Sequence, residues 1–192
     1  MRSLFLTVVP LLTSLAVLPS LVAADEFCED LWFTRNAIMD RAGYCFGSNL
    51  GRAIFDNTDC LGKNVRLNRG DQETVATLQS MEHDNDCRVD TSQSQLSLKD
   101  LKHRHALWFL PIRDLSESAC IGWLGDQAGL RAGPTLDAPI IGKIAPGDTI
   151  GYSYLPHANW DYVQVFDSNW NFKSAGWSDL RITPKTCRQI AG

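Results

Sequence analysis

Histidines are the residues of this 192-residue chain best suited to hold a metal ion. His103 and His105 alternate as they would on a strand, and His83 stands beside Asp84 and Asp86. A catalytic zinc ion needs three protein ligands and one open coordination position. If His83, His103 and His105 met in space, the chain could carry out metal-dependent hydrolysis. Histidines in a charged segment are more often solvated, and we therefore expect no metal.

No residue stands in the sequence context of a catalytic nucleophile. Ser116 and Ser118 lack the G-x-S-x-G surroundings of a hydrolase serine, and no phosphate-binding loop occurs. Glu29 and Asp30 are adjacent, so their carboxylates would point in different directions on a helix. Disulfide pairing would leave no thiol free. We therefore expect neither an enzyme nor a cofactor.

Two arginines in the stretch 35–55 could bind an anion, but their spacing argues against it. Arg35 and Arg41 lie six residues apart, so they do not share one helical face. Each can instead lay its stem on apolar surface and bond a carboxylate such as Asp30 or Asp56, or a free carbonyl at a helix end. We interpret this stretch as scaffold.

Aromatic residues near the end of the chain are the best lead to a binding site. Trp170 lies in the polar segment 168–174, and an exposed indole beside polar groups is typical of clefts for peptides and sugars. Alternatively, Trp170 covers one end of the fold, while Trp123 and Trp177 belong to the core. The residues expected to contact a ligand are Trp160, Tyr162, Trp170 and Phe172.

The N-terminal segment 1–24 has the pattern of a secretory signal peptide. Arg2 precedes an apolar run that ends in small residues, and we expect cleavage after Ala24. The remaining chain should then not insert stably into a membrane. The whole chain has a formal net charge of −4 and no basic run, which argues against a nucleic-acid partner. We expect a periplasmic or secreted protein.

All six cysteines follow this segment, and an even number in an exported chain indicates three disulfides. Fifteen pairings can be drawn. Antiparallel helices would bring Cys28 near Cys87, Cys45 and Cys60 flank one short segment, and the two remaining cysteines lie at the ends of a β-rich region. The expected pairs are therefore Cys28–Cys87, Cys45–Cys60 and Cys120–Cys187. No pair has the C-x-x-C spacing of a zinc site.

The elements divide into a helical part and a strand part. In residues 25–90, apolar residues recur every three or four positions, Gly43 is suited to end a first helix, and Asn68 is suited to cap a later one. Residues 91–118 suggest a polar linker with a short helix and an extended segment. Residues 119–188 contain five to seven short β-branched and aromatic runs separated by turn residues, which predicts a small β-barrel.

Five short motifs in this last region occur in the order found in bacterial SH3-like domains. They are LRAGP at 130–134, IIGKI at 140–144, PGD at 146–148, WDYVQV at 160–165 and GW at 176–177. The segment 119–188 therefore resembles that family, with a longer insert at 167–175. The resemblance implies an SH3-like β-barrel.

The helical part resembles the YARHG domain, a small extracellular bacterial module. The resemblance rests on Leu31-Trp32, Arg35-Asn36, Ile38, Arg41, Gly43-Tyr44 and Phe46. The expected fold is therefore α+β: a disulfide-stapled helical module followed by an SH3-like barrel. This combination resembles exported Gram-negative proteins of unknown function.

Both families occur beside enzymes that act on cell wall, and we therefore expect a non-catalytic module that binds peptidoglycan or an envelope protein. One alternative is a metal-dependent cell-wall hydrolase that uses His83, His103 and His105. Another is an inhibitor or assembly factor for a second exported protein, which would show a large exposed apolar patch.

Overall fold

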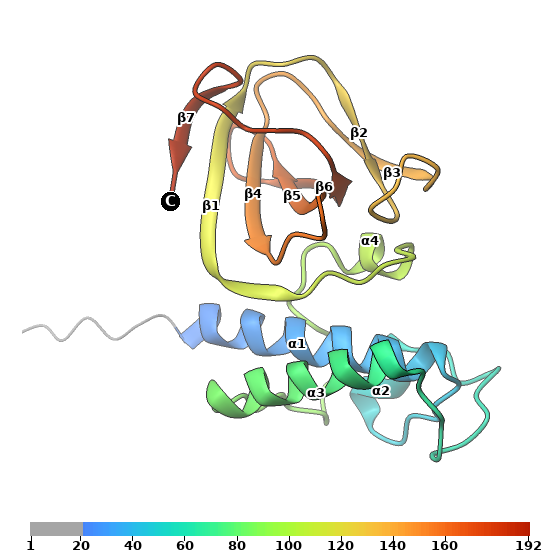
Figure 1. Cartoon of the computed structure of the whole chain (residues 1–192). Helices are drawn as coiled ribbons and strands as arrows, with labels where there is room; N and C mark the ends of the chain where they lie inside the picture. The colour runs from blue at the N-terminus through green and yellow to red at the C-terminus, as the bar shows by residue number, and fades with distance from the viewer. Residues whose placement is uncertain (1–20) are drawn as a thin grey trace, which may run out of the picture.

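Helices precede strands along the part of the chain that the computed structural model describes, residues 21–192. The helices are α1 (Leu21–Arg41), α2 (Asn49–Ile54), α3 (Arg69–Asp84) and α4 (Leu101–His105). The first three form a lower layer and the strands an upper one (Figure 1). The predicted signal peptide falls outside the described residues except for its last four positions, which are the first turn of α1. Among residues 21–192, no helix is both long and apolar enough to span a bilayer.

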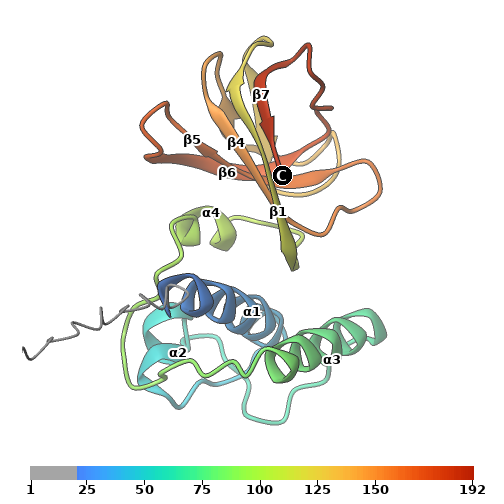
Figure 2. The ribbon, with the colours of Figure 1, turned by 90° about the vertical axis from the view of Figure 1, so that its left-hand side faces the viewer.

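The helical layer is built on α1 and α3, which lie side by side and antiparallel (Figures 1 and 2). Leu31, Ile38 and Leu78 are buried between them. Gly43 ends the first helix with a left-handed φ of +85°, and the Asn68 side chain accepts a hydrogen bond from the amide of Asp71 at the start of α3. The sequence predicts both of these helix ends.

Arg35 and Arg41 in the stretch 35–55 bind groups that lie far along the chain. Arg35 Nε donates to the carboxylate of Glu82 on α3, at 3.0 and 3.1 Å. Arg41 donates to the backbone carbonyls of Leu107 and Trp108, at 2.6 and 3.2 Å. Their role is structural, as expected, but Arg35 binds a different carboxylate from the two suggested by the sequence.

Three disulfides fasten the described chain, and they join the same pairs that the sequence suggests. Cys28–Cys87 links α1 to the residues after α3, and Cys45–Cys60 closes the loop around α2. Cys120–Cys187 lies within the buried core of the upper layer. Trp123 belongs to the same cluster and Trp177 to a neighbouring one, and both are buried, as predicted, with exposed fractions of 4 and 1 per cent.

The upper layer is one antiparallel sheet of seven strands in the order β3-β2-β6-β5-β4-β1-β7. The strands are β1 (Arg113–Trp123), β2 (Ala128–Arg131), β3 (Ile140–Ile144), β4 (Thr149–Tyr154), β5 (Asp161–Phe166), β6 (Phe172–Ser178) and β7 (Cys187–Ala191).

This sheet is open, which corrects the prediction of a closed SH3-like barrel. The long strand β1 pairs with β4 on one side and with β7 on the other. In consequence β7 and β3 stand at opposite ends of the strand order, and they are not paired with each other. The sequence motifs indicate where the strands lie, but they carry no information on whether the two edges meet.

The segment between the layers, which includes α4, packs against its neighbours and is not an extended linker. Helix α4 lies between α1 and the sheet in both views (Figures 1 and 2). Leu98 and Leu107, on either side of it, are buried. Strand β1 begins at Arg113, so the expected boundary at residues 118 and 119 falls inside this strand.

Candidate functional site

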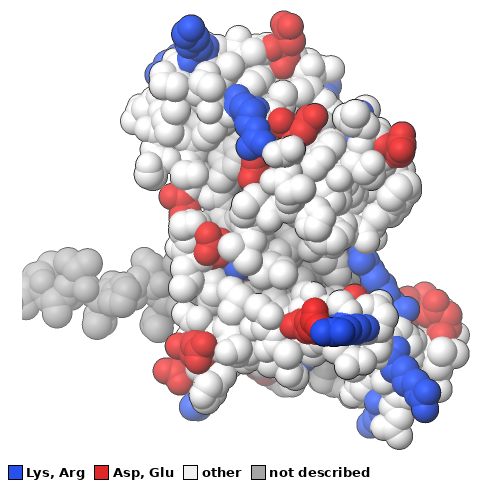
Figure 3. Space-filling model, in the orientation of Figure 1, with Lys and Arg blue, Asp and Glu red and all other residues white. Residues whose placement is uncertain are grey.

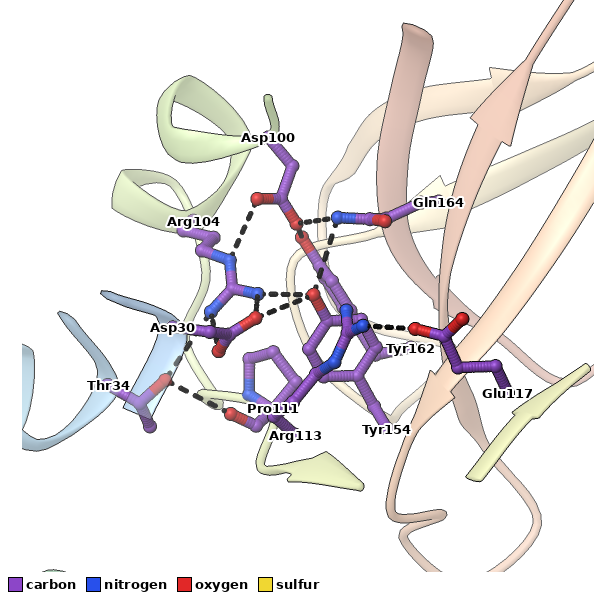
Figure 4. A network of polar contacts seen from close by, with 10 residues as sticks. All are labelled: Asp30, Thr34, Asp100, Arg104, Pro111, Arg113, Glu117, Tyr154, Tyr162 and Gln164. Atoms are coloured by element: carbon purple, nitrogen blue, oxygen red, sulfur yellow. Dashed lines mark hydrogen bonds and ion pairs between the residues drawn. The ribbon is translucent and has the colours of Figure 1, made fainter. Parts of the chain in front are cut away.

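A buried network of polar side chains joins the helical layer to the sheet (Figure 4). Its members come from α1, α4, β4, β5 and the residue before α4. They are Asp30, Asp100, Arg104, Tyr154, Tyr162 and Gln164.

Arg104 is the centre of this network and is fully buried. Its Nε donates to Asp100 Oδ1 at 2.9 Å, and its Nη1 and Nη2 donate to the two carboxylate oxygens of Asp30 at 2.8 and 2.5 Å. Burial alone would lower the pKa of Arg104, but Asp100 and Asp30 raise it well above its usual value. The guanidinium therefore carries its charge inside the protein, balanced by two carboxylates.

Asp100 accepts hydrogen bonds from two further groups besides Arg104. Its Oδ2 accepts hydrogen bonds from the Tyr162 hydroxyl at 2.9 Å and from Gln164 Nε2 at 3.0 Å. Burial alone would raise the pKa of Asp100, but Arg104 and these hydrogen bonds hold it below its usual value. Tyr162 is therefore a buried member of the network and is only 1 per cent exposed. The prediction that it contacts a ligand is wrong.

A cleft of about 500 Å³ opens beside the network. Gln164 belongs to both, since it donates to Asp100 and also lines the cleft. The cleft is formed by α1, the residue before Asp100, strands β1, β4 and β5, the turn after β5, and the C-terminal end of the chain at β7. Charged and aromatic side chains line it, among them Glu26, Lys99, Arg113, Glu117, Phe166 and Trp170.

Trp170 stands at the edge of this cleft and is 58 per cent exposed. Its ring centroid lies 6.0 Å from that of Phe166. Its backbone is left-handed, with φ +63°, which is unusual for a bulky side chain. Asp167 holds this turn by accepting hydrogen bonds from the amides of Asn169 and Asn171 at 2.8 and 2.9 Å. Trp170 thus projects from a fixed turn, packs on one side against Phe166 and leaves more than half of its side chain exposed.

The other predicted ligand-binding aromatics lie elsewhere. Trp160 and Phe172 are half-buried and pack against the cluster that contains Tyr162 and Trp177. Of the four residues expected to contact a ligand, Trp170 alone lines the cleft. Strand alternation places Trp160 and Tyr162 on the same face, but it does not say which face the core occupies.

The three candidate metal-binding histidines have separate environments. His103 packs against Phe172, with ring centroids 5.5 Å apart, and His105 packs against Phe33 at 5.4 Å. His83 is exposed near the end of α3. Burial lowers the pKa of His103 and of His105. Within the described range 21–192, no group of three His, Cys, Asp or Glu side chains could hold a metal ion.

Charges of both signs are mixed on the face drawn in Figure 3, without an extended basic area there. Nucleic-acid binding requires clustered Lys and Arg to displace counterions. That face therefore lacks the cluster of Lys and Arg that nucleic-acid binding requires.

Sequence reasoning missed the charged lining of the cleft and the centre of the network. Asp100 and Arg104 stand four residues apart between Leu98 and Leu107, which is the pattern of a short helix with one buried face. That signal was available, but the surrounding polar residues favoured a linker. Lys99, Arg113 and Glu117 had no local signal, because only the fold brings them together.

Comparison with known families divides the chain at the same place as the two layers. Residues 86–192 match the family described as Domain of unknown function (DUF4453), and the chain belongs to this family. Residues 7–83 match the YARHG domain. No curated protein and no solved structure matches the chain. The disulfides and the YARHG match indicate an exported protein, since disulfides persist in oxidising compartments.

Proposed function

We propose that this chain is a non-catalytic binding protein of the periplasm or the cell exterior, and that its cleft takes a segment of peptidoglycan. The cleft is in the size range of ligand sites, about 300 to 1,000 Å³. An aromatic wall and a few charged groups are the composition expected of a site for a sugar- and peptide-containing polymer.

The exposed side chain of Trp170 is the observation that carries this proposal. An indole that is 58 per cent exposed, on a left-handed turn fixed by Asp167, has no role in the core. Backbone strain of this kind is concentrated at functional sites. We include in this proposal a relationship of residues 119–188 to bacterial SH3-like domains. The order of the sequence motifs in this segment supports that relationship.

The second candidate ligand is an envelope protein. In that case the chain would act as an inhibitor or assembly factor for that protein. Trp108 and Phe109 are 61 and 41 per cent exposed, and both lie against the loop at Gly133. Leu136 in that loop is 66 per cent exposed. Exposed apolar groups of this kind favour a protein partner. The metal-dependent hydrolase has no comparable support, because its three histidines pack in different places.

The test is a pull-down of the mature, oxidised protein on purified peptidoglycan sacculi. We expect wild type to be retained, Trp170→Ala to be lost, and Trp108→Ala to behave as wild type. Trp108 is the matched control, because it is equally exposed and does not line the cleft. Absence of wild-type retention would reject peptidoglycan. Loss of retention in Trp108→Ala with normal Trp170→Ala would move the site to the second surface.

A further inference from the structure

Arg113 in the cleft differs from the other buried arginine in how its charge is balanced. Both guanidinium groups lie near the ring of Tyr154, with Arg104 Cζ at 5.1 Å and Arg113 Cζ at 5.3 Å from its centroid. Arg104 has two buried carboxylates. Arg113, whose side chain is 12 per cent exposed, has one ion-pair partner within the described chain, the exposed Glu117 at 2.5 Å. Burial alone would lower the pKa of Arg113, but Tyr154, the more distant Asp30 and Glu117 raise it.

The ion pair of Arg113 with Glu117 uses only part of the guanidinium. Glu117 accepts from Nη2, while Nε is buried and has no hydrogen-bond partner among the described residues. Nε and the neighbouring Nη normally form a planar fork that binds both oxygens of one carboxylate. The fork of Arg113 is therefore half filled.

Glu117 is also poorly fixed as a partner. Its side chain is 67 per cent exposed, whereas that of Arg113 is 12 per cent exposed. Figure 4 shows the single contact between the two side chains. Exposed ion pairs contribute little, because solvent screens them and the side chain must be held in one geometry. A ligand carboxylate that enters the cleft can therefore replace Glu117 on Nη2, next to the unpaired Nε.

The geometry points to Arg113 as the carboxylate-binding residue of the cleft, with Glu117 occupying that place in the free protein. The ligand class is a peptide that carries a free carboxylate, and Trp170 and Phe166 contact its apolar part. Lys99, whose Nζ lies 5.9 Å from the centroid of the Phe166 ring, is a second cation for the same ligand. This inference rests on the proposed function for the location of the site.

The experiment uses the mature, oxidised chain labelled with ¹⁵N and follows the indole N–H signal of Trp170 by NMR. The probes are N-acetyl-Ala-Ala, which has a free carboxylate, and its C-terminal amide. We expect the acid to bind wild type at least about tenfold more tightly than the amide, as is usual for a charge-assisted hydrogen-bond pair. Equal binding of the two probes, or no shift with either, would overturn the inference.

Glu117→Gln is the decisive variant, because it changes an exposed side chain and should not impair folding. It should bind the acid at least about threefold more tightly than wild type, since Arg113 loses its competitor. Unchanged or weaker binding would overturn the inference. Arg113→Gln should lose the preference for the acid, and the exposed Arg181, which pairs with Asn159 outside the cleft, supplies the control Arg181→Gln.

The sacculus pull-down separates the two proposals. If sacculi retain wild type and Glu117→Gln equally and the acid probe shows no preference, the wall-binding function stands and the role of Arg113 fails. If the acid probe binds as expected and sacculi do not, the role of Arg113 stands and peptidoglycan is rejected as the ligand.

Discussion

Arg104 on α4 binds Asp30 on α1 through both oxygens of its carboxylate, and the two residues are 74 positions apart in the chain. The Tyr154 hydroxyl, from the sheet, donates to the same carboxylate at 2.8 Å. One buried charge pair therefore contacts the helical layer, the segment between the layers and the sheet. The two parts matched by different families are in this way a single packed unit.

Replacing Arg104 by methionine should strongly destabilise the protein. The change leaves Asp30 and Asp100 buried without their cation, which typically costs about 3–5 kcal/mol. Urea unfolding of the oxidised chain measures this loss. Arg69→Met is the control, because the Arg69–Glu73 pair is exposed and should contribute under about 0.5 kcal/mol. Similar losses in both variants would contradict the central role of Arg104.

The protein should lose stability in acid through Asp100. The pKa of this carboxyl is lower in the folded protein than the usual value of about 3.9 in an unfolded chain. Its stabilisation is thus fully present above about pH 4 and is lost as the pH falls through the folded pKa. Urea midpoints measured from pH 7 to about pH 2 should show this fall. The fall should be smaller in Asp100→Asn, and an identical fall would show that other groups are responsible.

Removal of the Cys120–Cys187 disulfide should weaken the pairing of β7 with β1. Its loop spans 67 residues, and the chain-entropy model gives about 4 kcal/mol for such a loop. Since β7 stands at the edge of the sheet and pairs only with β1, its amides should lose protection first in the double serine variant. Hydrogen exchange across 187–191 measures this effect. Removing Cys45–Cys60 should leave those amides protected.

Asp167→Ala should weaken ligand binding without unfolding the protein. The side chain of Asp167 fixes the turn that holds Trp170 in its left-handed conformation. Without it the indole should move freely, and retention on sacculi should fall several-fold with an unchanged urea midpoint. Asp90→Ala is the matched control, because Asp90 accepts hydrogen bonds from Ser92 in a similar exposed turn away from this cleft. Normal retention of Asp167→Ala would show that the turn is not required.

Local patterns in the sequence predict much of this fold. Helix ends have strong local signals, and Gly43 and Asn68 are placed as their residue types require. The disulfide pairs also follow from local reasoning, since antiparallel helices bring Cys28 to Cys87. These features depend on residues close in the chain or on one simple packing rule.

Features that depend on long-range packing were not predicted from the sequence. Tyr162 looks like a site residue because aromatic side chains serve both cores and clefts, and only the fold brings its hydroxyl to Asp100, which lies 62 residues earlier. Likewise, the segment around Arg104 is polar enough to suggest a linker. A polar residue can be buried when distant partners satisfy it, and those partners cannot be identified from the local sequence.

The buried carboxylate of Asp30 also constrains the order in which parts of the chain can pack together. A chain is synthesised from its N-terminus, and the partners of Asp30 follow 74 and 124 residues later. Arg104 can pair with Asp30 first, but until Tyr154 has been made Asp30 lacks its hydrogen bond to the sheet. Helix α1 can close its disulfide to Cys87 early, but its second face can be covered only after β4 exists. Docking of the sheet onto α1 therefore requires that β4 has already been made.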